Sequence, residues 1–187
     1  MGRWEPNARG RLEEAALQLY SDRGFDRTTV AEIAEHAGLT ERTYFRYFTD
    51  KREVLFGGEG ALDEIITHAV AEAGHAVAPI DAVAAGLTAV GEMFRGRADH
   101  ARRRQAVIAA NPGLQERELI KLSRLAASTA DALRRRGVAE PTASVTAETA
   151  IAVFKVAFER WVTDGGELAD VIADSFAELK TVAGAGQ

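Results

Sequence analysis

The sequence predicts an all-α protein, and three observations indicate that fold class. Apolar residues recur at spacings of three and four along most of the 187-residue chain, whereas no stretch alternates convincingly between apolar and polar residues. Each of the four prolines falls where a helix would begin or end. Hydrophobic residues make up 47% of the chain and charged residues 27%, a composition typical of a globular protein with a substantial core.

The first predicted helix runs from about Asn7 to Arg23. Its apolar residues share one face, because they recur every three or four positions. Gly24 then provides a left-handed C-cap, and Phe25 can fold back onto the last turn. The residues of this apolar face are Leu12, Ala15, Ala16, Leu19 and Tyr20.

Two short helices follow the first. Thr29 and Glu32 form a capping box, in which each side chain binds the free amide of the other residue, and the helix that they open ends at Gly38. Thr40 caps the next helix, over residues 41–47. Three compact helices with a tight glycine-containing turn between the second and the third form a helix-turn-helix pattern.

Six longer helices are predicted beyond this pattern, and Asp50 caps the first of them. Three glycines within residues 57–60 each weaken that helix by up to about 1 kcal/mol relative to alanine, which permits a kink there. The chain is therefore expected to divide into a helix-turn-helix DNA-binding domain, residues 1–56, and a larger helical domain, residues 57–187. The six helices cover residues 50–74, 80–95, 98–110, 113–136, 142–163 and 167–182.

Charge confines any DNA-binding surface to a small patch. The net charge of −5 argues against a protein coated in positive charge, but residues 42–52 carry four basic side chains against one acidic one. Taken singly, an exposed arginine is usually only solvated, and a threonine at a helix start is usually only a cap. Two short capped helices, the Ala-Gly turn and an aromatic cluster occur together here, however, and together they favour DNA binding.

The third short helix is the candidate for the major groove. Such a helix presents base-reading side chains from its N-terminal half and phosphate contacts from its flanks. Tyr44 and Phe48 lie one turn apart on the side of the core. Arg42 then points outward and can offer a bidentate fork to guanine, while Phe45 can touch a thymine methyl group. The candidate DNA-binding residues are Thr29, Thr40, Glu41, Arg42, Thr43, Phe45, Arg46, Tyr47 and Lys51.

The segment from Phe25 to Lys51 reads FDRTTVAEIAEHAGLTERTYFRYFTDK and closely resembles the N-terminal domain of TetR-family transcriptional regulators. The resemblance spans roughly residues 9–56, and the rest of the chain fits the family in being helical and of the right length. It implies a homodimeric repressor whose larger domain binds a small molecule that weakens operator affinity. The family usually has tyrosine at the position of Phe45, with a hydroxyl that reaches a phosphate, and Phe45 cannot donate that bond. The phosphate contacts that the resemblance supports are Thr29, Thr43, Tyr47 and Lys51.

The last two helices predict a homodimer with two-fold symmetry. The apolar residues of helix 167–182 form one broad stripe, whereas those of helix 142–163 cover more than one face, which indicates burial on two sides. One side can meet the chain's own domain and the other a partner, so that two copies form a four-helix bundle. The alternative is a pair of core helices wholly internal to one chain. The candidate interface residues are Ile151, Phe154, Phe158, Leu168, Val171, Ile172, Phe176 and Leu179.

An effector site is expected within residues 80–163, where large or polar side chains stand among many alanines. This composition indicates an apolar or aromatic small molecule with one polar end, although the arginine runs 102–104 and 134–136 leave an acyl-CoA-like anion open. The alternative is that the same residues are plain core. The family resemblance implies that the bound ligand moves helix 50–74 and so changes the distance between the two DNA-binding domains of the dimer, which then no longer matches the spacing of the operator half-sites. The candidate effector-binding residues are Met93, Phe94, His100, Asn111, Phe158 and Trp161.

Other functions find little support in the sequence. It contains no GxSxG motif, no phosphate-binding glycine loop and no nucleophile beside a base, so neither an enzyme nor a cofactor is expected. Cysteine is absent, and the stripe of Glu64, His68, Glu72 and His75 favours a solvated helix face over a metal site. Without a membrane span or a signal peptide, the expected location is the cytoplasm. Two alternatives remain: a constitutive repressor without an inducer, and a helical protein-interaction module.

Overall fold

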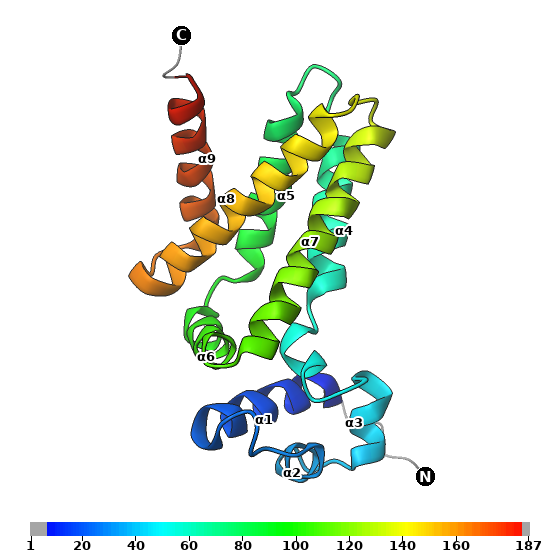
Figure 1. Ribbon diagram of the computed structural model, residues 1–187, viewed down its shortest axis with the longest axis vertical. Coiled ribbons are helices and arrows are strands. Elements are labelled where there is room, and N and C mark those ends of the chain that lie inside the picture. The colour runs from blue at the N-terminus through cyan, green and yellow to red at the C-terminus, as the bar shows by residue number, and fades with distance from the viewer. Residues whose placement is uncertain (1–6, 185–187) are drawn as a thin grey trace. The chain divides into compact units, whose positions relative to one another are not determined.

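The computed structural model describes residues 7–184, and every regular element within them is a helix (Figure 1). The all-α class predicted from the sequence is therefore confirmed. None of the described helices is long and apolar enough to cross a membrane. The elements are α1 (Ala8–Arg23), α2 (Val30–His36), α3 (Glu41–Tyr47), the 3₁₀ turn η1 (Glu53–Phe56), α4 (Glu59–Glu72), α5 (Pro79–Met93), α6 (Ala98–Ala109), α7 (Pro112–Arg135), α8 (Thr142–Asp164) and α9 (Leu168–Gly184).

The short helices α2 and α3 begin at the caps predicted from the sequence. The Thr29 hydroxyl accepts the amide N–H of Glu32 at 3.3 Å, and the Glu32 carboxylate accepts the amide N–H of Thr29 at 2.8 Å. The Thr40 hydroxyl accepts the amide N–H of Thr43 at 3.2 Å. Because each cap satisfies amides that the first helical turn leaves free, the side chains in these two turns have defined directions.

The single helix predicted over residues 50–74 is wrong. The chain forms η1 first, then passes through Gly57 and Gly58, and only then enters α4. The Asp50 carboxylate does cap this segment, because it accepts the amide N–H groups of Arg52 at 2.7 Å and Glu53 at 3.2 Å. Two glycines in succession give the helix too little support to continue across this point, as their low helix propensity indicates.

The contacts divide the chain into two compact units, and each is described by itself. The N-terminal unit contains the residues up to Gly57 together with Arg103–Glu118, and the C-terminal unit contains the rest. We call Arg103–Glu118, where α6 ends and α7 begins, the elbow. The division predicted from the sequence places the elbow in the larger domain, whereas its apolar residues join the core of α1–α3. The functional division at residue 56 stays a prediction. These elbow residues are Val107, Ile108 and Leu114.

Helix α5 is central to the C-terminal unit and packs against α4, α8 and α9. The approach between α5 and α9 is close, since a Cβ atom added to Gly91 would lie 2.7 Å from the Cα atom of Ala169. A glycine is required at this crossing because any side chain would meet backbone. The core of this unit includes Ile66, Val70, Val83, Leu87, Leu133, Ala150, Phe154, Trp161, Leu168 and Ile172.

Gly91→Ala is expected to lower the free energy of unfolding by about 1–3 kcal/mol, because the added methyl group forces α5 and α9 apart. The matched control is Gly60→Ala, since no described atom lies within 4 Å of a Cβ added at Gly60. The control is expected to be neutral or to stabilise the protein by up to about 1 kcal/mol. Urea denaturation at fixed protein concentration measures both values. Equal stability of the two variants would contradict the close crossing.

Candidate nucleic-acid interface

Helix α3 is anchored on one side and exposed on the other. Tyr44 is fully buried and Phe48 is 4% exposed, and their rings lie 5.3 Å apart in the core of the N-terminal unit. Two other large aromatic side chains of α3 lie in solvent: Phe45 is 54% exposed and Tyr47 is 39% exposed. Buried anchors of this kind hold a short helix rigidly while its outer side remains free for a partner. The exposed residues of α3 are Glu41, Arg42, Phe45, Arg46 and Tyr47.

Two buried tyrosine hydroxyls fix the chain that follows α3. Tyr44 donates a hydrogen bond to the carbonyl of Asp50 at 3.1 Å, and Tyr20 of α1 donates one to the carbonyl of Lys51 at 2.5 Å. Burial, reinforced by the negative charge of Asp50, raises the pKa of both tyrosines well above the ordinary value. Both hydroxyls therefore stay protonated and remain donors.

Lys51 turns inward toward the loop that joins α1 to α2. Its ammonium group donates to the carbonyls of Phe25 at 2.9 Å and Thr28 at 3.2 Å, and it lies 4.3 Å from the centre of the Phe25 ring. A third carbonyl, that of Asp26, lies at 3.4 Å. Lys51 was predicted as a phosphate contact from its position; in the structure its donors are directed to carbonyls, so it also holds the α1–α2 loop in place. The phosphate contact stays a prediction.

Lys51→Ala is expected to lower the free energy of unfolding by about 1–3 kcal/mol, because part-buried carbonyls lose a charged donor. Affinity is expected to fall by the same factor for all DNA sequences. The slope of the log association constant against the log salt concentration is expected to decrease in magnitude by about 1, as for a lost phosphate contact. Urea denaturation and DNA titrations at several salt concentrations measure these effects. Lys155→Ala is the control, since Lys155 is an exposed residue 3.9 Å from Glu159. Wild-type stability and an unchanged salt slope would count against both roles.

The cations beside α3 differ in how they are paired. Arg52 binds the Asp50 carboxylate at 3.0 Å. Burial raises the pKa of Asp50, but the hydrogen bonds from the Arg52 side chain and backbone outweigh burial and hold the pKa below its ordinary value. Asp50 therefore stays charged. Arg46 donates to the Tyr47 hydroxyl at 3.1 Å and lies 4.9 Å from the centre of that ring. Within residues 7–184, Arg42 has no carboxylate partner. Arg42 is thus the cation on α3 that is most available to a ligand.

Thr29 and Thr40 lie at the starts of α2 and α3, as predicted, and both are exposed. The Thr29 hydroxyl also donates to the Glu32 carboxylate at 2.9 Å. The backbone hydrogen bond from Thr29 is the main cause that holds the pKa of Glu32 below its ordinary value. The Thr43 hydroxyl lies 3.1 Å from that of Thr40. The structure therefore brings the predicted threonines, arginines and aromatic residues to one region of the N-terminal unit around α2 and α3.

Two sequence families match the chain. Residues 12–56 match the family described as bacterial regulatory proteins, tetR family, and residues 77–184 match the MftR C-terminal domain. The second match alone spans more than half of the chain. The chain belongs to the TetR family. Members of this family are DNA-binding transcriptional regulators, and the resemblance inferred from residues 25–51 is confirmed.

Two curated relatives are regulators as well. A protein described as a mycofactocin biosynthesis transcriptional regulator, MftR from Mycobacterium tuberculosis, is 26% identical over 175 residues, which cover 88% of this chain and 84% of the relative. The HTH-type transcriptional regulator TcmR from Streptomyces glaucescens is 34% identical over 82 residues. That alignment covers 44% of this chain and only 36% of TcmR, so the chain spans about a third of that relative in the match.

Solved structures share the TetR fold at low sequence identity. The SmeT–triclosan complex superposes with a TM-score of 0.65 at 18% identity, covering 95% of this chain and 90% of SmeT. FadR from Thermus thermophilus, a TetR-family repressor in complex with lauroyl-CoA, gives a TM-score of 0.52 at 19% identity, covering 90% of this chain and 91% of FadR. These likenesses show the fold.

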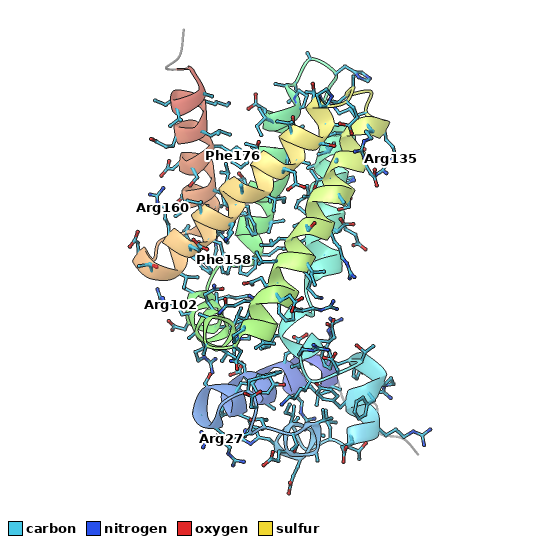
Figure 2. The ribbon with its side chains drawn as sticks, in the orientation of Figure 1. Arg27, Arg102, Arg135, Phe158, Arg160 and Phe176 are labelled. Carbon is cyan, nitrogen blue, oxygen red and sulfur yellow. The ribbon has the colours of Figure 1, made fainter. Side chains whose placement is uncertain are left out.

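The predicted effector residues only partly lie together. Phe94, Phe158 and Trp161 form an aromatic cluster with ring centres 5.5–5.8 Å apart, and Phe158 is labelled in Figure 2. Met93 is next in sequence and exposed, and His100 is half-buried on α6. Asn111 belongs to the other compact unit, where it donates to the carbonyl of Val107 and lines a groove of about 610 Å³ with residues of α1. The clustered aromatics stay candidates for TetR-family effector contacts.

Most of the predicted dimer residues are buried within their own chain, which corrects the expectation that they face a partner. The stripe of α9 packs on α5 and α8, and the inward face of α8 packs on α5, so neither stripe is free in the single chain. Phe158, Val171 and Leu179 are half-buried. The side of α8 that remains exposed carries Val145, 61% exposed, and Val156, 53% exposed. The predicted interface residues that are buried in the chain itself are Ile151, Phe154, Leu168, Ile172 and Phe176.

Proposed function

We propose that the protein is a ligand-responsive repressor in the cytoplasm that binds palindromic operator DNA as a homodimer and is released by a small, largely apolar effector. The observation that carries the DNA-binding part is the geometry of α3. Its buried Tyr44 and Phe48 fix the helix, and its exposed residues include two cations without a carboxylate partner in the described chain, Arg42 and Arg46, together with two aromatic rings. Membership of the TetR family supports the same function.

Helix α3 enters the major groove in this proposal. Arg42 donates its fork to guanine, Glu41 can accept from a cytosine amino group, and Phe45 packs on a thymine methyl group. Arg46 is held beside Tyr47 by a hydrogen bond, so these two side chains approach the same stretch of backbone. The residues assigned to phosphate oxygens are Thr29, Thr40, Thr43, Tyr47 and Lys51.

Dimerisation through α8 and α9 uses their exposed sides. Val145, Thr149, Ala152 and Val156 recur at spacings of four, three and four along α8, so they lie in one row. Val145, Ala152 and Val156 are exposed in the single chain. A homodimer with two-fold symmetry fits an operator whose palindromic half-sites lie about 34–36 Å apart, one turn of the DNA helix.

The effector is proposed to bind in the C-terminal unit beside Phe94, Phe158 and Trp161. Two structural neighbours hold triclosan and lauroyl-CoA, molecules with large apolar parts, and this supports an apolar effector here. The ligand acts by binding one conformation of the protein better than another, and it shifts DNA affinity by that difference, commonly about 1–3 kcal/mol.

Selection from a random-sequence duplex pool tests the proposal. The full-length protein is expected to enrich a palindrome, to bind it as a dimer in light scattering, and to release it when lauroyl-CoA or triclosan is added as a probe. DNA binding without release by these probes or by a wider metabolite set would favour a constitutive repressor. Failure to bind any duplex at low salt would contradict the proposal and favour a helical protein-interaction module.

A further inference from the structure

Two arginines of the elbow hold η1, the short turn that follows the DNA-reading helix. The elbow lies about 50 positions along the chain from η1, yet both belong to the N-terminal unit. Neither arginine is assigned a DNA contact in the function proposed above. Their contacts therefore need a separate explanation.

Arg104 makes three contacts around η1. Its Nε atom donates to the carbonyl of Leu55 at 2.8 Å, and its guanidinium carbon lies 5.1 Å from the centre of the Phe56 ring. Its Nη1 atom donates to the Glu118 carboxylate at 2.9 Å. The Arg104 and Glu118 side chains are only 21% and 25% exposed. A half-buried guanidinium with three directed partners is a specific anchor, because its planar fork fixes the directions of its hydrogen bonds.

Arg117 holds the first residue of η1. Its Nε atom donates to the Glu53 carboxylate at 2.7 Å, and the two side chains are 27% and 18% exposed. Partial burial reduces solvent screening, so this ion pair is worth more than one on the open surface. Together, Arg104 and Arg117 bind η1 at both of its ends.

The turn η1 leads directly to the residues that fix α3. Glu53 follows Asp50 and Lys51 by three and two positions. The carbonyl of Asp50 receives the Tyr44 hydroxyl from α3, and that of Lys51 receives the Tyr20 hydroxyl from α1. A displacement of η1 thus moves the acceptors that hold the end of the reading helix.

We propose that Arg104 and Arg117 are positioning residues for sequence-specific DNA binding, which act through η1 on the orientation of α3. This inference rests on the proposed DNA-binding function. Base readout requires hydrogen-bond geometry at each contact, whereas attraction to phosphates depends mainly on charge. Loss of the contacts between these arginines and η1 therefore weakens specific DNA binding more than non-specific DNA binding.

The elbow also contains a matched control. Arg103, next to Arg104, donates to the Glu14 carboxylate on α1 at 3.0 Å. This pair has side chains 43% and 53% exposed. It joins the same two parts of the chain by the same chemistry, but it does not touch η1. Arg103→Gln therefore removes one positive charge and one ion pair, as Arg117→Gln does, without releasing the turn.

The test uses the full-length variants Arg104→Gln, Arg117→Gln and Arg103→Gln. The probes are a duplex that the wild-type protein selects from a random pool and a scrambled duplex of the same composition. Arg104→Gln and Arg117→Gln are each expected to lower affinity for the selected duplex about tenfold and for the scrambled duplex by less than about twofold. Hydrogen exchange at the amides of residues 48–56 is expected to become faster in these two variants only. Arg103→Gln is expected to match the wild type in both measurements.

Arg117→Lys distinguishes positioning from general stabilisation. It keeps an ion pair with Glu53 and is expected to restore most of the specific affinity that Arg117→Gln loses. Should Arg104→Gln fold poorly, seen as faster exchange in α9 as well, the two Arg117 variants decide the question. Equal losses on both duplexes, equal effects of Arg103→Gln, or specific affinity within about twofold of wild type would overturn the inference. If the wild-type protein selects no sequence, the proposed function itself has failed.

Discussion

Replacing Arg42 with alanine is expected to abolish most of the preference for one base pair in each operator half-site. A bidentate arginine–guanine contact is worth about 1–3 kcal/mol of discrimination against the wrong base. A homodimer presents Arg42 twice to a palindrome, so symmetric substitution of that base pair tests a difference of about 2–6 kcal/mol. Competition between the selected operator and a panel of symmetric single-position variants measures it.

Arg124→Ala is the control for Arg42→Ala. Arg124 is an exposed arginine on α7, in the C-terminal unit, so its loss changes the net charge equally but leaves α3 intact. We expect the control to keep the base preference at every position. Affinity of Arg42→Ala for scrambled duplex is expected to fall only a few-fold, since phosphate contacts remain. An unchanged preference at all positions in Arg42→Ala would contradict the assignment of α3 as the base-reading element.

Phe176→Ala is expected to lower the free energy of unfolding by about 3–5 kcal/mol, the usual cost of deleting a buried phenyl ring. Phe176 is 4% exposed within its own chain and is labelled on α9 in Figure 2. Because this ring is core and lies outside the proposed interface, the protein that remains folded is expected to stay dimeric. Urea denaturation at fixed protein concentration gives the stability, and light scattering gives the mass.

Val156→Glu is expected to disrupt the dimer while leaving the stability of the single chain nearly unchanged. Val156 lies on the exposed side of α8, so a carboxylate there is solvated in the single chain but is buried, and paired with its symmetry mate, in the proposed interface. We expect a folded monomer with reduced operator affinity. A dimeric Val156→Glu protein together with a monomeric, fully stable Phe176→Ala protein would contradict the proposed interface. It would indicate that the residues predicted from the sequence form the dimer contact instead.

Local sequence signals account for the helix-turn-helix well. The capping box at Thr29 and the cap at Thr40 depend on residues three positions apart, and the structure places those hydrogen bonds as expected. The exposed positions of α3 follow from the one-turn spacing of Tyr44 and Phe48. Both signals arise within a few residues, so no knowledge of the rest of the chain is needed to interpret them.

Periodicity is less informative where a helix has two neighbours. The apolar stripes of α8 and α9 look alike whether they face α5 or a second copy of the chain, because burial removes the same side chains from water in both cases. Only the packing of α5 shows that Phe176 and Ile172 are internal and that Val145 and Val156 remain outside. The effector candidates have the same ambiguity: Asn111 matches them in composition but belongs to the other compact unit.

The sequence by itself determined the helical class, the short capped helices and the outward side of α3, since each depends on hydrogen bonds or side-chain directions set within one or two turns. The tertiary structure alone decided two features: the inward direction of Lys51, and the contacts of Arg104 and Arg117 with η1. These features depend on contacts between residues 23 to 64 positions apart. Such contacts arise only when separate helices pack together, and no local pattern encodes them.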